Sequence, residues 1–347
     1  MKLRELIDKL ESEEVLRKNE WITLLEEYTE EDAGYAAKKA RLIADKIYGK
    51  EIYIRGLIEF TNYCKNDCYY CGIRRSNQNA DRYRLTREQI LECCDKGWEL
   101  GYRTFVLQGG EDGFYNDAWF EETIVRIKEA YPECAITLSL GERSRESYQR
   151  LFDAGADRYL LRHETANELH YGKLHPEELH LKNRKECLWN LREIGYQVGC
   201  GFMVGSPYQT SAELAEDMEF IHQLKPHMVG IGPFIPQADT PFAKEAQGTL
   251  SMTLFLLSLI RIMEKHVLLP ATTALGTIDP KGRELGILAG ANVIMPNLSP
   301  VSVREKYKLY DNKICTGEEA AECRACIDRR ITSIGYNIVS KRGDYKV

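Results

Sequence analysis

The chain has 347 residues, of which 44% are hydrophobic and 29% charged, with 26 glycines and 11 prolines. This composition supports a hydrophobic core and excludes disordered and collagen-like proteins. The length allows two modest domains or one α/β barrel with extensions. The net charge of -6 lacks the basic excess of a nucleic-acid-binding protein. The eleven cysteines are too sparse for a secreted disulfide framework, and they favour cytosolic metal or redox use.

Neither a signal peptide nor a membrane span is expected from the sequence. Residues 1–10 alternate charged side chains with leucine and lack the apolar core of a signal peptide. The longest apolar stretch, residues 254–262, contains Ser258 and Arg261 and is too short to cross a bilayer. We therefore predict a cytoplasmic protein without membrane or nucleic-acid partners.

The chain divides into a helical start and a longer α/β region. Residues 1–50 show only helical patterns, with Thr29 as an expected N-cap and Gly49 as a stop, and they form an N-terminal helical extension. From residue 51, short β-rich runs alternate with amphipathic helical segments. The predicted strands are 52–60, 104–108, 135–139, 158–161, 198–204, 228–231, 269–273 and 292–295. Eight such units favour a (βα)8 TIM-type barrel over residues 51–300, followed by a cysteine-containing C-terminal extension, residues 301–347; an open doubly wound sheet is the alternative.

The clearest chemical motif is Cys64-Lys-Asn-Asp-Cys68-Tyr-Tyr-Cys71, just after the first predicted strand. That is the end of a barrel at which active sites lie. Three thiolates can hold three irons of a 4Fe-4S cluster and leave the fourth iron open to a small molecule. The alternatives are a zinc loop completed by a distant ligand, or three incidental cysteines. The motif resembles that of radical SAM enzymes, in which S-adenosylmethionine (SAM) chelates the open iron and is cleaved to a 5′-deoxyadenosyl radical.

Polar residues follow other predicted strands. Gln108-Gly109-Gly110-Glu111 combines glycines that permit close approach with an acid that can bind an ammonium group, although a plain tight turn is the alternative. Beside the cysteine loop it resembles the GGE segment that receives the methionine amino group in this superfamily.

Arg162 and Glu164 share one face by alternation. Arginine can grip a carboxylate and glutamate can hold ribose hydroxyls, while a salt bridge between the two is the alternative. His163 is interpreted as a packing or supporting histidine.

Two later segments could also line a ligand site. The glycines at 199, 201 and 205 resemble the strand on which adenine rests in radical SAM barrels. The segment with Thr272, Thr273 and Thr277 offers amides and hydroxyls for an anion or carboxylate.

A second cysteine set, Cys315-x7-Cys323-x2-Cys326, follows the eighth predicted strand. It suggests an auxiliary iron-sulfur cluster, of 2Fe-2S or 4Fe-4S type, or zinc, and the alternative is cysteines that bind no metal. The segment from Tyr307 to Tyr310 is predicted to be helical and to carry this site away from the cavity mouth.

Longer strings resemble the HydE family of FeFe-hydrogenase maturases across residues 51–330. They are Ile58-Glu-Phe-Thr-Asn62, Arg82-Tyr-Arg-Leu-Thr86, Leu138-Ser-Leu-Gly-Glu142, Leu160-Leu-Arg-His-Glu-Thr165, Val229-Gly-Ile-Gly-Pro-Phe-Ile-Pro236, Ala271-Thr-Thr-Ala-Leu-Gly-Thr277 and Ala291-Asn-Val-Ile-Met-Pro-Asn297. The tail cysteine spacing also belongs to that family's pattern. Biotin synthase and methylornithine synthase are relatives. The 2Fe-2S ligand set of the former has no clear counterpart here, and the tail cysteines argue against the latter.

This resemblance implies a barrel whose radical acts on the sulfur of a cysteine-bound iron complex carrying carbon monoxide and cyanide, in assembly of the hydrogenase H-cluster. It implies a tyrosine-lyase maturase and a scaffold maturase as partners, and a reductant such as ferredoxin or flavodoxin. By motif match, the cofactor-binding residues are Gln108, Gly110, Glu111, Ser139, Arg162, Glu164, Arg184, Met203 and Met295, and Tyr307 and Tyr310 are candidates for a catalytic tyrosine. The alternatives are a related radical SAM enzyme of the biotin synthase or methylornithine synthase type, or an iron-sulfur scaffold without catalysis.

Overall fold

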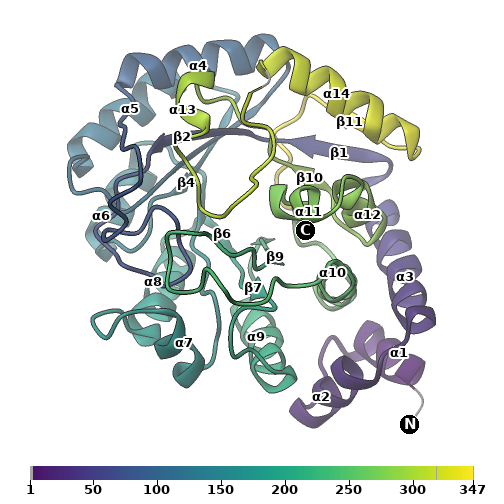
Figure 1. Ribbon diagram of the computed structural model, residues 1–347. Helices are drawn as coiled ribbons and strands as arrows, with labels where there is room; N and C mark the ends of the chain where they lie inside the picture. Colours follow the sequence, from purple (N-terminus) through teal and green to yellow (C-terminus); the bar gives the residue numbers. More distant parts are fainter. Residues whose placement is uncertain (1–2, 318, 347) are drawn as a thin grey trace.

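The computed structural model describes residues 3–317 and 319–346. Three helices open the chain: α1 (Leu3–Glu13), α2 (Lys18–Glu27) and α3 (Glu30–Tyr48). As predicted, the Thr29 hydroxyl accepts a hydrogen bond from the Asp32 amide and caps α3, and Gly49 ends it at a φ of 65°. Helix α3 packs along α10 (Leu250–Met263), and α2 packs along α9 (Ser211–Leu224). The extension therefore lies outside the ring of helices (Figure 1).

A parallel barrel follows. One sheet has the order β2 (Gly56–Thr61), β3 (Thr104–Gly109), β4 (Ala135–Ser139), β5 (Arg158–Leu160), β6 (Gln197–Cys200) and β8 (Met228–Val229). Around the remaining side, β10 (Val293–Ile294) pairs with β1 (Glu51–Ile54), and Asn297 bridges Leu57 of β2. The TIM-type α/β fold is thus confirmed.

The predicted seventh strand, 269–273, is not a regular strand. Single bridges join Leu268 to Met228 and Pro270 to Val293, so the backbone still fills this position in the barrel. Pro270 has no N–H to donate to a ladder, and Thr273 begins helix α11 (Thr273–Ile278). The predicted strand 198–204 is also split at Gly201, beyond which β7 (Met203–Val204) pairs with β9 (Gly232–Pro233).

Helices alternate with the strands around the outside. They are α4 (Arg87–Glu99), α5 (Asp117–Ala130), α6 (Arg145–Asp153), α7 (Glu168–Leu174), α8 (Leu181–Ile194), α9 and α10, with the short α11, α12 (Gly282–Leu288) and α13 (Val301–Arg304) near the end of the barrel. A capping box formed by Thr86 and Gln89 begins α4. None of the helices in the described part of the chain is long and apolar enough to cross a membrane.

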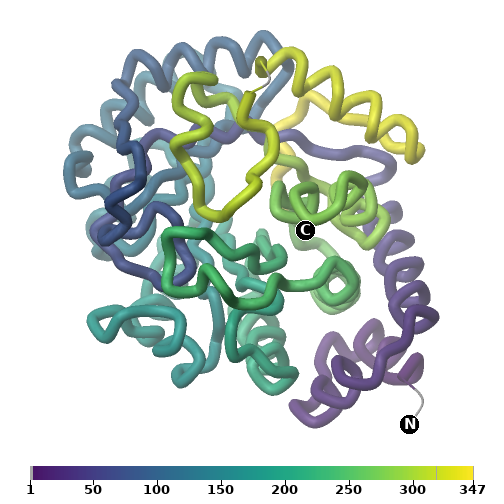
Figure 2. Tube along the Cα trace, viewed as in Figure 1, coloured from purple at the N-terminus to yellow at the C-terminus, as the bar shows by residue number. Residues whose placement is uncertain are grey.

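The chain after α13 visits both ends of the barrel. Contrary to prediction, residues 307–310 are not helical. Their backbone bonds to neighbouring loops instead, since Gly72 N–H donates to Leu309 O and Asp311 N–H donates to Pro236 O. Figure 2 traces this segment across the barrel before α14 (Ala320–Ser333) begins. It therefore runs over the cavity rather than away from it.

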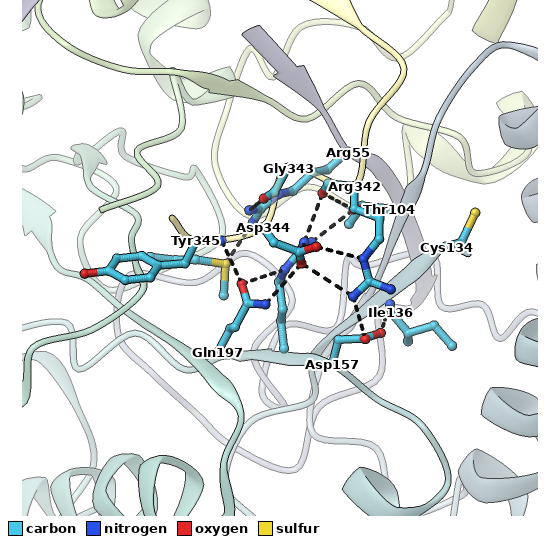
Figure 3. Close-up of polar contacts among 12 residues, drawn as sticks. Arg55, Thr104, Cys134, Ile136, Asp157, Gln197, Arg342, Gly343, Asp344 and Tyr345 are labelled. Carbon is cyan, nitrogen blue, oxygen red and sulfur yellow. Dashed lines mark hydrogen bonds and ion pairs between the residues drawn. The ribbon is translucent and has the colours of Figure 1, made fainter. Parts of the chain in front are cut away.

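The last residues close the opposite end of the barrel. Strand β11 (Asn337–Val339) pairs with β1, and the following turn lies among the first residues of β3, β5 and β6 (Figure 3). Asp344 accepts hydrogen bonds from Arg158 at 2.6 Å and from Gln197 at 3.1 Å. The Arg342 carbonyl accepts one from Thr104 at 2.8 Å. Because Arg158 is fully buried, the Asp344 carboxylate neutralises the Arg158 charge inside the barrel. The polar contacts among Thr104, Arg158, Gln197, Arg342 and Asp344 are called the polar floor of the barrel.

Candidate functional site

A cavity of about 340 Å³ lies at the carboxyl ends of the strands, between the cysteine loop and the segment that follows α13. Seventeen of the predicted site residues line it: Cys64, Cys68, Cys71, Gln108, Gly110, Glu111, Ser139, Arg162, Glu164, Arg184, Met203, Thr272, Thr273, Met295, Tyr307, Tyr310 and Cys315. Thr277, Cys323 and Cys326 are not among its lining residues. The fold therefore places residues from separate sequence motifs around one cavity.

The cysteine loop has no regular secondary structure and is held from several sides. Lys65 N–H donates to Glu111 O at 2.9 Å, and Arg74 Nε donates to Asp67 Oδ1 at 2.7 Å within the loop. Burial raises the pKa of Cys71 to about 12 and that of Cys68 well above its ordinary value, and the neighbouring thiols add to both shifts. Such thiols stay protonated unless a cation stabilises the thiolates. Three thiols in one short loop, all lining the same cavity, fit the thiolate ligation of a 4Fe-4S cluster.

The Gly-Gly-Glu segment lies directly against this loop. A Cβ on Gly110 would lie 2.2 Å from Tyr63 O and 2.8 Å from Cys64 Cβ, so only glycine fits. The Glu111 amide donates to Cys64 Sγ at 3.4 Å. The Glu111 carboxylate accepts the Glu142 amide at 3.1 Å and lies 3.1 Å from Lys65 Nζ. These contacts fix the position of Glu111 beside the cysteine loop.

Arg162 and Glu164 face the cavity together. The salt bridge between them, which was the alternative interpretation of the sequence, is present, with Arg162 Nη2 2.9 Å from Glu164 Oε2. The contact lacks hydrogen-bond alignment, and Arg162 Nε, Arg162 Nη2 and Glu164 Oε2 are buried atoms without a hydrogen-bond partner among the described residues. Such atoms carry a desolvation penalty that a bound polar ligand removes. They fit the carboxylate and hydroxyl groups of SAM.

Arg184 of α8 supports this pair from behind. Its Nε donates to Glu142 Oε1 at 2.5 Å, and its Nη1 donates to the Arg162 carbonyl at 2.8 Å. Both guanidinium contacts are with the protein, so Arg184 holds the Arg162 backbone as well as lining the cavity.

The threonine segment forms another part of the wall. Thr272 Oγ1 is buried without a hydrogen-bond partner among the described residues, and Arg283 Nη2 donates to Thr273 Oγ1 at 3.3 Å. The Nη2 of Arg283 also lies 3.6 Å from Cys315 Sγ. Thr277 instead donates its hydroxyl to the Thr273 carbonyl within α11. The polar side chains that line the cavity here are Thr272, Thr273 and Arg283, and Arg283 was not predicted.

Sequence reasoning also missed a charged group deep in the cavity. Lys313 Nζ donates to Glu59 Oε1 at 2.5 Å and to the Tyr307 carbonyl at 3.0 Å. Asn297 Nδ2 donates to the other Glu59 oxygen at 2.8 Å. Glu59 and Asn297 stand inside strings that resemble the HydE family, which was the available signal. Lys313 lies in an irregular segment with no pattern to mark it.

The two candidate tyrosines border this group. Tyr307 is buried, and Gln108 Nε2 donates to its hydroxyl at 3.5 Å. Burial raises the pKa of Tyr307 well above its ordinary value and that of Tyr310 to about 12. Burial therefore opposes ionisation of both phenols.

The tail cysteines lie in different environments. Cys315 lines the cavity, Cys323 is buried on α14, and Cys326 is exposed on the same helix. Within residues 3–317 and 319–346, no group of three or more His, Cys, Asp or Glu is arranged as an ion site, and this holds for the cysteine loop as well as for the tail cysteines. The second cluster therefore remains a prediction from the sequence.

The barrel, the three-cysteine loop and the cavity define a radical SAM enzyme, and residues 58–221 match the family described as Radical SAM superfamily. The chain is 44% identical to the [FeFe] hydrogenase maturase subunit HydE of Thermotoga maritima, over 96% of this chain and 94% of that protein. It therefore belongs to the HydE family of FeFe-hydrogenase maturases. It is 28% identical to 3-methylornithine synthase of Methanosarcina barkeri, over 92% and 89% of the two chains.

Solved structures show the same fold. Methylornithine synthase PylB superposes with a TM-score of 0.85 at 26% identity, covering 96% of this chain and 97% of that one. The hydrogenase maturase HydG superposes with a TM-score of 0.82 at 22% identity, covering 97% and 75%. Membership in the radical SAM superfamily implies a 4Fe-4S cluster and SAM, which the cysteine loop and cavity fit.

Proposed function

We propose that this enzyme cleaves SAM reductively and directs the resulting radical at a sulfur-containing substrate, a cysteine-bound iron complex carrying carbon monoxide and cyanide, during H-cluster maturation. The single observation that supports this most is one cavity that joins the three loop thiols to the Arg162–Glu164 ion pair, in which Arg162 Nε, Arg162 Nη2 and Glu164 Oε2 make no hydrogen bond among the described residues. The 44% identity to a HydE maturase subunit supports the place in hydrogenase maturation.

The proposal assigns a role to three groups of residues that line the cavity. Cys64, Cys68 and Cys71 hold three irons, and the cluster with SAM supplies the 5′-deoxyadenosyl radical. Arg162 and Glu164 bind the polar groups of SAM. The buried hydroxyl of Thr272 and the adjacent Arg283 guanidinium bind a substrate carboxylate, since both retain unpartnered atoms.

The proposed partners follow from the same assignment. A tyrosine-lyase maturase delivers the iron complex, a scaffold maturase receives the product, and a ferredoxin or flavodoxin supplies the electron. We also propose a cytoplasmic location and a second iron-sulfur cluster at Cys315, Cys323 and Cys326. The name of the HydE relative supports a place in hydrogenase maturation, and the spacing Cys315-x7-Cys323-x2-Cys326 supports the second cluster.

The first experiment separates an enzyme from a scaffold. Anaerobically reconstituted protein is incubated with dithionite and SAM, and 5′-deoxyadenosine and methionine are measured by chromatography. Both products are expected from the wild-type protein and neither from the Cys68→Ala variant. A reconstituted 4Fe-4S protein that forms neither product is a scaffold, contrary to the proposal.

The second experiment tests the substrate wall. A cysteine-derived thiazolidine carboxylate should bind in the cavity and give ligand density beside Thr272 and Arg283 in crystals. Arg283→Gln should weaken its binding roughly ten- to hundredfold, because a charge-assisted hydrogen bond contributes about 1.5–3 kcal/mol. The exposed Arg17→Gln variant serves as the control. Density only on the protein exterior contradicts the assignment.

A further inference from the structure

Glu164 has an unusual backbone for a residue that faces a ligand site. Its φ is +65°, in the left-handed region that non-glycine residues rarely adopt. Such a conformation persists only where the surrounding structure enforces it. The source of that constraint is therefore part of how the site is built.

A buried histidine–aspartate pair lies immediately behind Glu164. His163 of the same loop and Asp217 of α9 both have fully buried side chains, with His163 Nε2 3.2 Å from Asp217 Oδ1. The Gly201 amide donates to His163 Nδ1 at 3.3 Å, which places the ring proton on Nε2, toward Asp217. His163 Nε2 makes no hydrogen bond of good geometry among the described residues. Its contact with Asp217 Oδ1 is a close polar contact between two buried side chains.

The pair clamps the backbone on both sides of Glu164. On one side, the Gly201–His163 contact stands beside the hydrogen bond from Glu164 N–H to Gly201 O at 3.0 Å. On the other side, the Ala166 amide donates to Asp217 Oδ1 at 2.6 Å. A single carboxylate thus contacts both His163 and Ala166, the residues that flank the Glu164–Thr165 dipeptide. The clamp fixes the turn in which Glu164 points into the cavity.

We infer that the His163–Asp217 pair is a positioning device for the SAM site, which holds Glu164 in its left-handed conformation so that its carboxylate faces the ligand. The inference rests on the proposed role of Glu164 in binding SAM. Burial lowers the pKa of His163 to about 3 and raises that of Asp217, the directions expected for ionisable side chains packed away from water. Neither side chain lines the cavity, so their effect reaches SAM through Glu164.

Two substitutions of His163 separate the pair from simple packing. His163→Asn keeps an acceptor near the Nδ1 position and loses the Nε2 donor, whereas His163→Gln can keep a donor near Nε2. In the reconstituted holoenzyme, we expect His163→Asn to weaken SAM binding roughly tenfold and His163→Gln by less than about threefold, as for loss or retention of one buried polar contact. Asp217→Ala, which removes the contact from the helix side, should behave like His163→Asn.

Phe220→Leu is the matched control. The Phe220 ring packs against His163 at 4.9 Å between centroids but makes no polar contact with it. This variant should lower the melting temperature and leave the SAM dissociation constant unchanged. Crystals of His163→Asn should show Glu164 outside the left-handed region, a structural readout independent of turnover.

A double-mutant cycle with Glu164→Ala completes the test, because residues that act through one another are not additive. In the Glu164→Ala background, His163→Asn should change SAM affinity by less than about twofold. The inference is overturned if His163→Asn weakens SAM binding equally in the wild-type and Glu164→Ala backgrounds. It is also overturned if His163→Asn and Asp217→Ala leave the SAM affinity unchanged. Unchanged affinity in Glu164→Ala overturns the SAM-binding role of Glu164 and this inference with it. A loss in Glu164→Ala alone overturns only the role of the pair.

Discussion

Lys313 Nζ lies 2.5 Å from Glu59 Oε1 inside the barrel, although 254 positions separate the two residues in the chain. Both side chains are almost fully buried, and Asn297 satisfies the second Glu59 oxygen. Lys313 also bonds to the Tyr307 carbonyl. The ion pair thereby ties the segment that covers the cavity to β2, and it keeps the candidate tyrosine Tyr307 in the cavity wall.

Removal of one partner of this pair should be costly. Lys313→Ala leaves the Glu59 carboxylate buried without its cation, and we expect the free energy of unfolding to fall by about 3–5 kcal/mol. Chemical denaturation of the wild-type and variant proteins measures the difference. The double variant Glu59→Gln/Lys313→Met, which removes both charges, should recover most of the loss. A Lys313→Ala protein as stable as the wild type would contradict a stabilising role for the pair.

The cysteine loop should bind the catalytic cluster. Cys71→Ala leaves two thiolates for a cluster that needs three, so the variant should lose most reconstituted iron and all cleavage of SAM. Iron analysis and chromatography of 5′-deoxyadenosine measure these outcomes. Cys93→Ala is the control, because Cys93 is buried in α4 and does not line the cavity. Retained cleavage in Cys71→Ala would show that the cluster is held elsewhere.

The tail cysteines should bind iron that the radical reaction does not require. The triple variant Cys315→Ser/Cys323→Ser/Cys326→Ser should contain less iron yet form 5′-deoxyadenosine at a rate close to that of the wild-type protein. The reason is that Cys323 and Cys326 lie on α14, away from the cavity lining, and that Cys315, which does line the cavity, contacts Arg283. Loss of SAM cleavage in a well-folded triple variant would assign this site to catalysis.

The polar floor of the barrel should give a pH-dependent contribution to stability. Although burial acts to raise it, hydrogen bonding to Arg342 and the charge of Arg158 hold the pKa of Asp344 well below its ordinary value of 3.8. A carboxyl group with a lowered folded-state pKa stabilises the protein above its unfolded-state pKa, and that contribution is lost as the pH falls further.

Asp344→Asn should therefore lower the melting temperature at neutral pH, with a difference from wild type that shrinks below about pH 4. Thermal melts across this pH range measure the effect. Glu31→Gln is the control, since its ion pair with Arg4 is exposed and should contribute little. A wild-type-to-variant difference that stays constant into acid would contradict the role given to Asp344.

Local chemistry allowed much of the architecture to be predicted. The cap at Thr29 depends on a residue three positions away, and the spacing of Cys64, Cys68 and Cys71 is a property of one short loop. Strand ends in a parallel barrel meet at one rim, so motifs at those ends could be assigned to a common cavity before any contact was known. The family resemblance, rather than the physics of the residues, indicated the substrate chemistry.

Tertiary structure decided what local patterns do not encode. Residues 307–310 bond to the cysteine loop and the β9 loop instead of forming a helix, because their partners come from distant parts of the chain. The contacts of Lys313 with Glu59 and of Asp217 with His163 exist only after helices and strands have packed. The sequence by itself determined the class of enzyme and its cluster loop. The packed barrel determined which charges are buried together, because burial, not proximity in sequence, makes such pairs costly to leave unmatched.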